Sequence, residues 1–263
     1  MSKNKMIEKK FLLSPMQDEK GAIVYWKKYL NGYKQQAQVP KISGTIRKKQ
    51  YKTNLTQFTL DKELTDRIKD LARKNKTTVD LLFQTVWGIL LQKYNNVNDV
   101  VFGTVVSGRT AEINGIENII GLFINTVPVR IENGGDDTFL QLLNMVQDCA
   151  ADSKKYEYVS LAEIQQNTVL KQNLIDNIIV FENYPSIKSK SNTELTIKLE
   201  AVVEKTNYDF NIMVQMTDEL SVKLNYNLYA YDKQYVYMIE ENIIKVIKEV
   251  VENPEIKISE IEM

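Results

Sequence analysis

The chain has 263 residues, enough for one large domain or two small ones. Basic and acidic residues number 34 each, so the formal net charge is zero and nothing in it favours nucleic acid or an anionic membrane as a partner. The chain has no histidine, which excludes a Ser-His-Asp triad, a histidine zinc site and an imidazole base. The single cysteine, Cys149, excludes an internal disulfide, and we expect it to be a small buried core residue.

The sequence shows neither the pattern of a signal peptide nor that of a membrane helix. No N-terminal stretch combines a basic start with the apolar run of a signal peptide. The apolar runs also fall short of the roughly 18–20 residues that a membrane helix needs. We therefore expect a cytoplasmic protein without membrane partners.

The first half of the chain alternates between helical and extended patterns. Apolar residues at helical spacing predict a helix after Gly21, and alternation predicts a strand over 55–60, with Asp61 as the cap of the helix that follows. The clearest helix is 78–94, which repeats apolar residues at i, i+3, i+4 and i+7 after a Thr77 or Thr78 cap. Residues 100–106 and 122–131 are typical of buried strands.

The second half continues the alternation. A turn over 134–137 leads into a predicted helix over 138–153, and Ser160 is placed to cap a short helix that runs to Ile164. Strands are predicted over 174–181, 194–203, 210–216 and 220–229, the last two joined by a hairpin turn at 217–219. A helix over 233–251 ends before Pro254. Interleaved helices and strands favour an α/β sandwich with a mixed sheet.

The most informative stretch runs from Asp99 to Arg130, and above all its end over 120–130. Glycine permits close approach of a backbone or a ligand, and the polar pair Asn125-Thr126 inside an apolar run needs hydrogen-bond partners. This stretch closely resembles the Gly-x-Phe-x-Asn-Thr signature in the second half of nonribosomal peptide synthetase condensation domains.

Further segments resemble the same family in the same order. They are 25–33, 83–91, 101–109, 170–185, 207–210 and 251–255. The resemblance covers the chain from about Gly21 to its end and implies a chloramphenicol acetyltransferase-like fold, in which two similar lobes meet in a V around a reaction channel. This chain would be the C-terminal lobe, an α/β unit with a mixed sheet packed against helices.

The N-terminus resembles a different part of the same family. Residues 11–17 are similar to the motif that opens the first lobe, yet only residues 18–24 separate them from the helix that joins the two lobes. We expect residues 1–20 to be a tail and 21–263 to be the C-terminal lobe. The hypothesis is an internal deletion that removed most of the N-terminal lobe with its His-His-x-x-x-Asp-Gly motif; the alternative is a chance match in a polar tail.

The resemblance implies a chemistry and its partners. Condensation domains form an amide bond between aminoacyl or peptidyl thioesters, which peptidyl carrier proteins hold on phosphopantetheine arms. The second histidine of the motif positions the amine or takes its proton, and the second lobe supplies channel walls. We therefore expect no catalytic residue, no metal site and no bound cofactor in this chain. A further partner would be a separately encoded N-terminal lobe, or a second copy of this chain through self-association.

Six residues are the candidates for the channel wall that this resemblance implies. Gly103 and Gly108 would leave room for the arm, Ser107, Asn125 and Thr126 would hydrogen-bond its amides or the substrate, and Tyr208 would brace the channel floor. Alternatively, Asn125 and Thr126 satisfy neighbouring backbone. Arg109, Arg130 and Asp209 are expected to be structural. Related chains often carry histidine at the position of Asn177.

The sequence is compatible with three functions. The first is a truncated condensation domain that is inactive alone. The second is a stand-alone acyltransferase that uses a base other than histidine, and the third is a carrier-binding or docking module without catalysis. A severed lobe would expose the apolar face that met its partner, so we expect self-association or poor solubility.

Overall fold

A mixed sheet of six strands forms the centre of the molecule. The computed structural model describes residues 18–42, 51–109, 121–182 and 206–263. Within these residues the strand order is β1-β6-β5-β4-β2-β3, where β2, β4 and β5 run parallel and the other neighbours antiparallel. The strands are β1 (Thr53–Leu60), β2 (Asp99–Val106), β3 (Asn125–Glu132), β4 (Asn177–Glu182), β5 (Phe210–Met216) and β6 (Leu220–Asn227). The predicted α/β class is confirmed.

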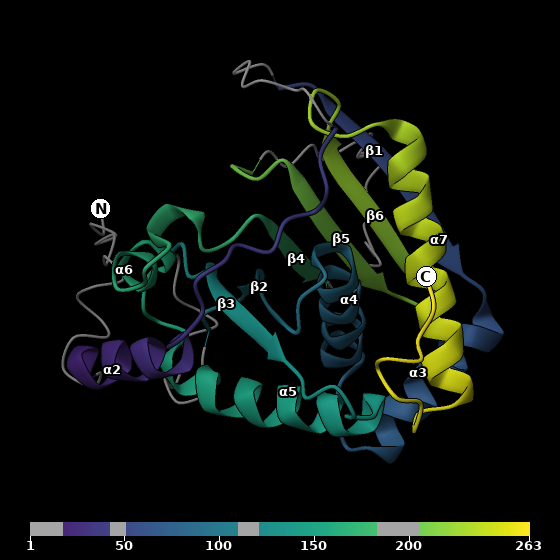
Figure 1. Cartoon of the computed structure of the whole chain (residues 1–263), viewed down its shortest axis with the longest axis horizontal. Helices are drawn as coiled ribbons and strands as arrows, with labels where there is room; N and C mark the ends of the chain where they lie inside the picture. The colour runs from purple at the N-terminus through teal and green to yellow at the C-terminus, as the bar shows by residue number, and fades with distance from the viewer. Residues whose placement is uncertain (1–17, 43–50, 110–120, 183–205) are drawn as a thin grey trace, which may run out of the picture.

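Helices pack on both faces of the sheet (Figure 1). Val100 and Phe102 of β2 join one core with α3 (Lys62–Lys74), α4 (Val79–Asn95), α5 (Phe139–Ser153) and α7 (Lys233–Glu252). Val101, between them, joins a smaller core with α2 (Glu19–Tyr29) and α6 (Leu161–Gln166). Because successive strand residues point to opposite faces, both faces of β2 are buried. Short 3-10 turns, η2 (Lys154–Tyr156) and η3 (Lys171–Asn173), connect these elements.

The predicted helix starts are confirmed by their caps. The Asp61 carboxylate accepts from Leu64 N at the start of α3, and the Thr78 hydroxyl accepts from Leu81 N at the start of α4. Thr138 and Gln141 form a capping box at the start of α5. Each cap satisfies backbone donors that the first helical turn leaves unpaired. The residue types that predicted the helix starts are therefore the ones that make these hydrogen bonds in the structure.

Two strands begin later than predicted, and the cysteine lies outside the core. Strand β3 begins at Asn125 rather than Leu122, because Leu122 and Ile124 are 79% and 59% exposed before it. Strand β4 begins at Asn177 rather than Leu174, although the residues between are buried. Apolar runs do not reveal where ladder pairing starts. Cys149 is half-buried at the rim of two hollows rather than in the core.

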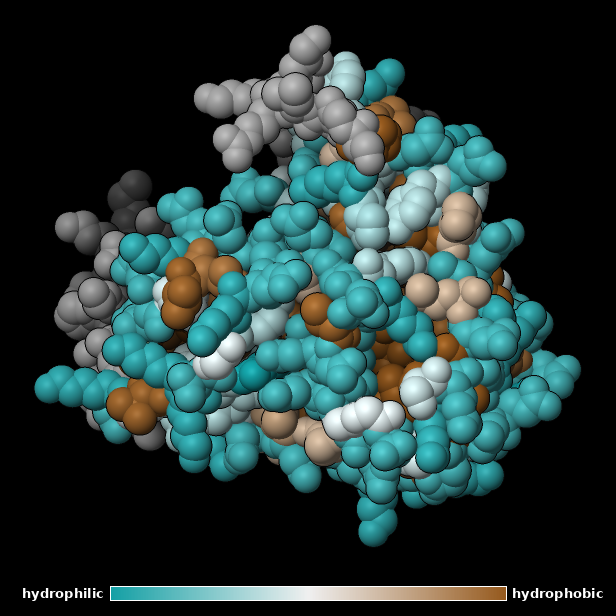
Figure 2. All heavy atoms as spheres, in the orientation of Figure 1, coloured by the Kyte–Doolittle hydropathy of each residue, from teal (hydrophilic) through white to brown (hydrophobic). Residues whose placement is uncertain are grey.

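Some expectations concern residues that the structure does not describe. The strand expected at 194–203, the motif at 11–17 and the end of the segment 170–185 lie outside the described ranges. Among the described helices, none combines the length and apolar character that a membrane crossing needs. The face seen in Figure 2 is mostly hydrophilic, with small separate hydrophobic patches.

Candidate functional site

Four of the six candidate wall residues lie at one end of the β2–β3 ladder. The register places Val106 opposite Asn125 and Val105 opposite Thr126. Ser107 and Gly108 follow directly on β2, so they lie at the same end. Gly103 lies further along β2, opposite Pro128. The sheet therefore groups the family signature with the turn that follows β2.

Asn125 is bonded to backbone. Its Nδ2 donates to the carbonyl oxygens of Glu157 and Val159, each at 2.7 Å. These bonds hold the segment between η2 and α6 against the start of β3. For Asn125, this contact is of the kind expected in the alternative role, in which the side chain satisfies backbone groups.

The two glycines serve close packing, which differs from the expectation that they leave room for an arm. A Cβ on Gly103 would lie 2.8 Å from Ile178 Cγ2 and 3.0 Å from Thr126 Cγ2, so protein side chains already fill that space. Gly108 has φ +63° and its backbone approaches the carbonyl oxygen of Phe123 too closely for any side chain. Beside it, the Arg109 guanidinium lies 4.5 Å from the centre of the Phe123 ring.

Arg130 connects the outer strand β3 to helix α2. Its guanidinium bonds both carboxylate oxygens of Asp99, at 2.9 and 2.8 Å, and the carbonyl oxygens of Tyr29 and Asn31 at 3.0 and 2.9 Å. The Glu132 carboxylate lies 3.0 Å away. Arg130 N also donates to Tyr29 Oη at 2.7 Å. Every donor group of this side chain has a structural partner.

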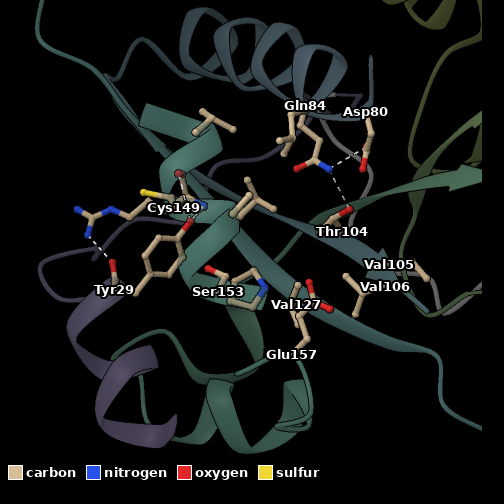
Figure 3. A pocket seen from close by; sticks show the side chains of 16 residues that line it. Tyr29, Asp80, Gln84, Thr104, Val105, Val106, Val127, Cys149, Ser153 and Glu157 are labelled. Atoms are coloured by element: carbon tan, nitrogen blue, oxygen red, sulfur yellow. Dashed lines mark hydrogen bonds between the residues drawn. The ribbon is translucent and has the colours of Figure 1, made fainter. Parts of the chain in front are cut away.

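A small hollow, here called the edge cavity, adjoins the grouped wall residues. It has a volume of about 120 Å³ and lies between β2–β3 and the helices α4 and α5 (Figure 3). Gln84 Nε2 donates to Asp80 Oδ1 at 2.8 Å and to Thr104 Oγ1 at 3.4 Å. Because binding pockets for whole small molecules usually measure about 300–1,000 Å³, the edge cavity is large enough only for the end of a ligand.

Two acidic groups that the sequence analysis missed line the edge cavity. Burial raises the pKa of the Asp80 carboxyl, although the hydrogen bond from Gln84 opposes this. Burial likewise raises the pKa of Glu157, with Lys154 opposing. Within the described residues the Glu157 carboxylate makes no hydrogen bond or ion pair. The sequence held one signal that Asp80 is partly buried. Asp80 is followed four residues later by Gln84, and both lie beside the apolar stripe of the helix.

Tyr208, the sixth candidate, lies elsewhere. It lines a polar pocket of about 630 Å³ together with Lys41, Asp176 and Asp209. Tyr208 lies just before β5, next to the start of β4. Ser107 lies just after β2, level with the end of β4. The two places are separated by the length of β4, about 17 Å. The structure therefore does not bring Tyr208 together with the four residues grouped at the end of the β2–β3 ladder.

A charge cluster forms one side of the polar pocket. Lys41 Nζ lies 3.3 Å from Asp176 Oδ1 and 3.3 Å from Asp209 Oδ2. Asp176 Oδ2 accepts from Val39 N at 3.1 Å, and Asp209 Oδ1 accepts from Asn227 Nδ2 at 2.9 Å. Each carboxylate oxygen therefore has a partner in the protein, and the cluster ties the segment before Lys41 to the starts of β4 and β5.

The cluster predicts a pH dependence of stability. Burial raises the pKa of Asp176 above 3.8 despite the opposing Lys41 charge. Between pH 3.8 and the native pKa, the native state therefore binds more protons than the unfolded state. Stability is then lost as the pH rises from 3.8 through the native pKa. We expect Asp176→Asn to remove this loss, a change of up to about 1.4 kcal/mol per pH unit in the slope of the unfolding free energy.

Denaturant unfolding at a series of pH values measures this slope. Asp136→Asn is the control, since the Asp136 side chain is 97% exposed, and its slope should equal that of the wild type. An unchanged slope in Asp176→Asn would contradict the prediction.

The comparisons with known proteins now give the class and the family. The mixed sheet with helices on both faces is an α/β lobe of the chloramphenicol acetyltransferase type. A family model of the condensation domain matches residues 8–263. The chain belongs to the condensation-domain family.

The similar curated proteins are peptide synthetases. Gramicidin S synthase 2 of Brevibacillus brevis is 41% identical over 251 residues, which are 93% of this chain and 6% of that protein. Tyrocidine synthase 3 of Brevibacillus parabrevis is 41% identical over 250 residues, or 93% and 4%. Bacitracin synthase 3 of Bacillus licheniformis is 40% identical over 252 residues, or 94% and 4%. The chain spans less than a tenth of each.

Solved structures share the fold at low identity. A holo four-domain nonribosomal peptide synthetase bound to AMP and glycine matches with a TM-score of 0.78 at 20% identity, over 94% of this chain and 20% of that one. The X-domain from teicoplanin biosynthesis matches with a TM-score of 0.77 at 19% identity, over 95% and 59%. At this identity the likeness establishes the fold alone.

Proposed function

We propose that this chain is the C-terminal lobe of a condensation domain and forms one wall of an amide-forming cleft. The family match over residues 8–263 carries the proposal. The reactants would be aminoacyl or peptidyl thioesters on the phosphopantetheine arms of peptidyl carrier proteins in the cytoplasm. The arms are substrates brought by partners, and the chain itself would hold no cofactor.

In this proposal the phosphopantetheine arm would lie at the end of the β2–β3 ladder. Ser107 is exposed there, and the edge cavity adjoining this end offers the Thr104 hydroxyl and the Gln84 amide to an arm that carries amide groups. Asn125 and Thr126 would act as positioning residues, because Asn125 fixes the segment that carries Glu157. Tyr208 would contact a ligand only in the separate polar pocket.

The chain is proposed to be inactive alone. Amide formation needs a group that takes the proton of the attacking amine, and the family motif supplies histidine for this step. This sequence contains no histidine. A separately encoded N-terminal lobe would supply it, and the remaining contribution of this wall would be orientation of the two thioesters.

A transfer assay with loaded donor and acceptor carrier proteins tests the proposal. We expect no amide product above the carrier-only background from this chain alone, and product when a histidine-bearing N-terminal lobe is added. With that lobe present, Asn125→Ala should lower the rate by about tenfold to a hundredfold, because misplaced wall segments cost orientation. Turnover by this chain alone that Asn125→Ala abolishes would overturn the claim of inactivity.

One observation favours a second candidate function, a stand-alone acyltransferase. Asp80 and Glu157 both have raised pKa values and line one cavity, which is the property of a carboxylate base that works near neutral pH. In this case Glu157→Gln should abolish any turnover that the chain shows alone. Retention of that turnover in Glu157→Gln would exclude Glu157 as the base.

A further inference from the structure

The two outer strands of the sheet are protected to different degrees. Unpaired outer strands template pairing with other chains, and proteins usually protect them with charges, proline, bulges or covering elements. On β3, Pro128 has no N–H to offer, and the backbone N and O of Arg130 are both bonded to Tyr29 Oη. Charged side chains at Arg130 and Glu132 add to this protection.

Strand β1 has none of these protections among the described residues. Its eight residues, Thr53–Leu60, include no charged residue and no proline. They pair with β6 in one unbroken register from Thr53 opposite Asn227 to Leu60 opposite Leu220, so there is no bulge. Such a straight, uncharged outer strand is suited to pairing with another strand.

The register shows which backbone groups of β1 point outward. Leu228 N donates to Lys52 O at 2.8 Å, and bonded and non-bonded pairs alternate along an antiparallel ladder. The residues whose backbone turns away from β6 are therefore Thr53, Leu55, Gln57 and Thr59. In the described part of the chain, no hydrogen bond reaches their outward N–H and C=O groups. Their side chains are also exposed, and Leu55 is 51% exposed.

We propose that β1 is the interface for a second copy of this chain, which pairs antiparallel with it across a two-fold axis. A two-fold pairing uses the same strand twice, so it must be self-complementary. The outward groups align when Thr53 of one copy lies opposite Thr59 of the other and Leu55 lies opposite Gln57. No like charges meet in this register.

The charges that flank β1 suit a second copy in particular. The uncharged strand is bounded by Lys52 at one end and Asp61 at the other. In the antiparallel pairing, Lys52 of one copy comes within one residue of Asp61 of the other, at both ends of the interface. Opposite charges on neighbouring strands stabilise such a pair. The resulting sheet would be continuous through both copies, and the inference is independent of the proposed function.

Light scattering of the full chain tests the interface over about 1 to 100 µM, because the mass of a reversible dimer depends on concentration. We expect the wild type to approach twice its 30.4 kDa mass. Leu55→Lys places a charge in the interface, and Gln57→Pro removes an outward N–H that β6 does not use; both should stay monomeric. Val24→Lys, at a 65% exposed position on α2, is the control and should still dimerise.

Amide hydrogen exchange of the wild type provides a measurement that needs no variant. We expect the amides of Leu55, Gln57 and Thr59 to exchange at least tenfold more slowly at the highest concentration than at the lowest, because dimer pairing covers them. A wild type that stays monomeric throughout overturns the proposal. So does a dimer that Leu55→Lys and Gln57→Pro leave intact, or one in which these three amides gain no protection.

Discussion

Trp87→Ala is expected to lower the free energy of unfolding by about 3–5 kcal/mol, the usual cost of removing a buried large aromatic side chain. Trp87 is fully buried in α4, and its ring stacks on Phe210 of β5 at 6.0 Å between ring centres. Phe210 in turn contacts Tyr231 edge to face. The cavity would therefore open at the contact between the central helix and the sheet. Denaturant unfolding followed by fluorescence or circular dichroism measures the loss.

The indole hydrogen bond makes a separate contribution that a double-mutant cycle isolates. Trp87 Nε1 donates to Asn177 Oδ1 at 2.9 Å, and both groups are buried. Trp87→Phe leaves that oxygen without its partner, which costs about 1–3 kcal/mol beyond the lost volume. We expect Asn177→Leu to recover much of this loss in the Trp87→Phe background. Additive effects of the two substitutions would contradict a coupled pair.

Arg130→Met is expected to lower the free energy of unfolding by about 2–4 kcal/mol, since it leaves desolvated partners unpaired. The Arg130 and Asp99 side chains are 13% and 28% exposed, so the pair is only partly screened by water. The substitution also removes the donors to the end of α2. Loss of these bonds should loosen the contact between α2 and the outer strand.

An exposed ion pair provides the matched control for Arg130. The Arg73 and Asp70 side chains are 78% and 57% exposed, one helical turn apart on α3. Arg73→Met should change stability by no more than about 0.5 kcal/mol. Arg130→Lys keeps the charge but loses the two-pronged contact with Asp99, and should fall between the two. Equal effects of Arg130→Met and Arg73→Met would show that the partly buried Arg130 network adds nothing to stability.

Local patterns were sufficient to predict most of the fold. Helix α4 and its Thr78 cap were predictable because the apolar spacing and the capping residue lie within one segment. The hairpin of β5 and β6 was predictable for the same reason. The start of β3 was not, because Leu122 and Ile124 are apolar residues that no other element covers in the described structure. An apolar pattern indicates what a residue can bury, and the tertiary fold decides whether it does.

The candidate site was less accessible to sequence reasoning. The partners of Asn125 lie 32 and 34 residues away in the chain, and the sequence around Asn125 does not predict them. The crowding around Gly103 comes from Ile178, on a strand that pairs only after a long connection. Asp80 is an ordinary helix-start residue in the sequence, and only the packing of α4 against β2–β3 makes it a half-buried carboxyl with a raised pKa.

The Tyr29 phenol has a consequence for how large an assembly can become. Burial raises the pKa of Tyr29 well above its usual value, so this hydroxyl keeps its proton at any physiological pH and goes on occupying the outer side of β3. When only one edge of a sheet can pair with another copy, the sheet stops growing once two copies have paired. Association of this chain would therefore end in a closed pair and not in a fibre.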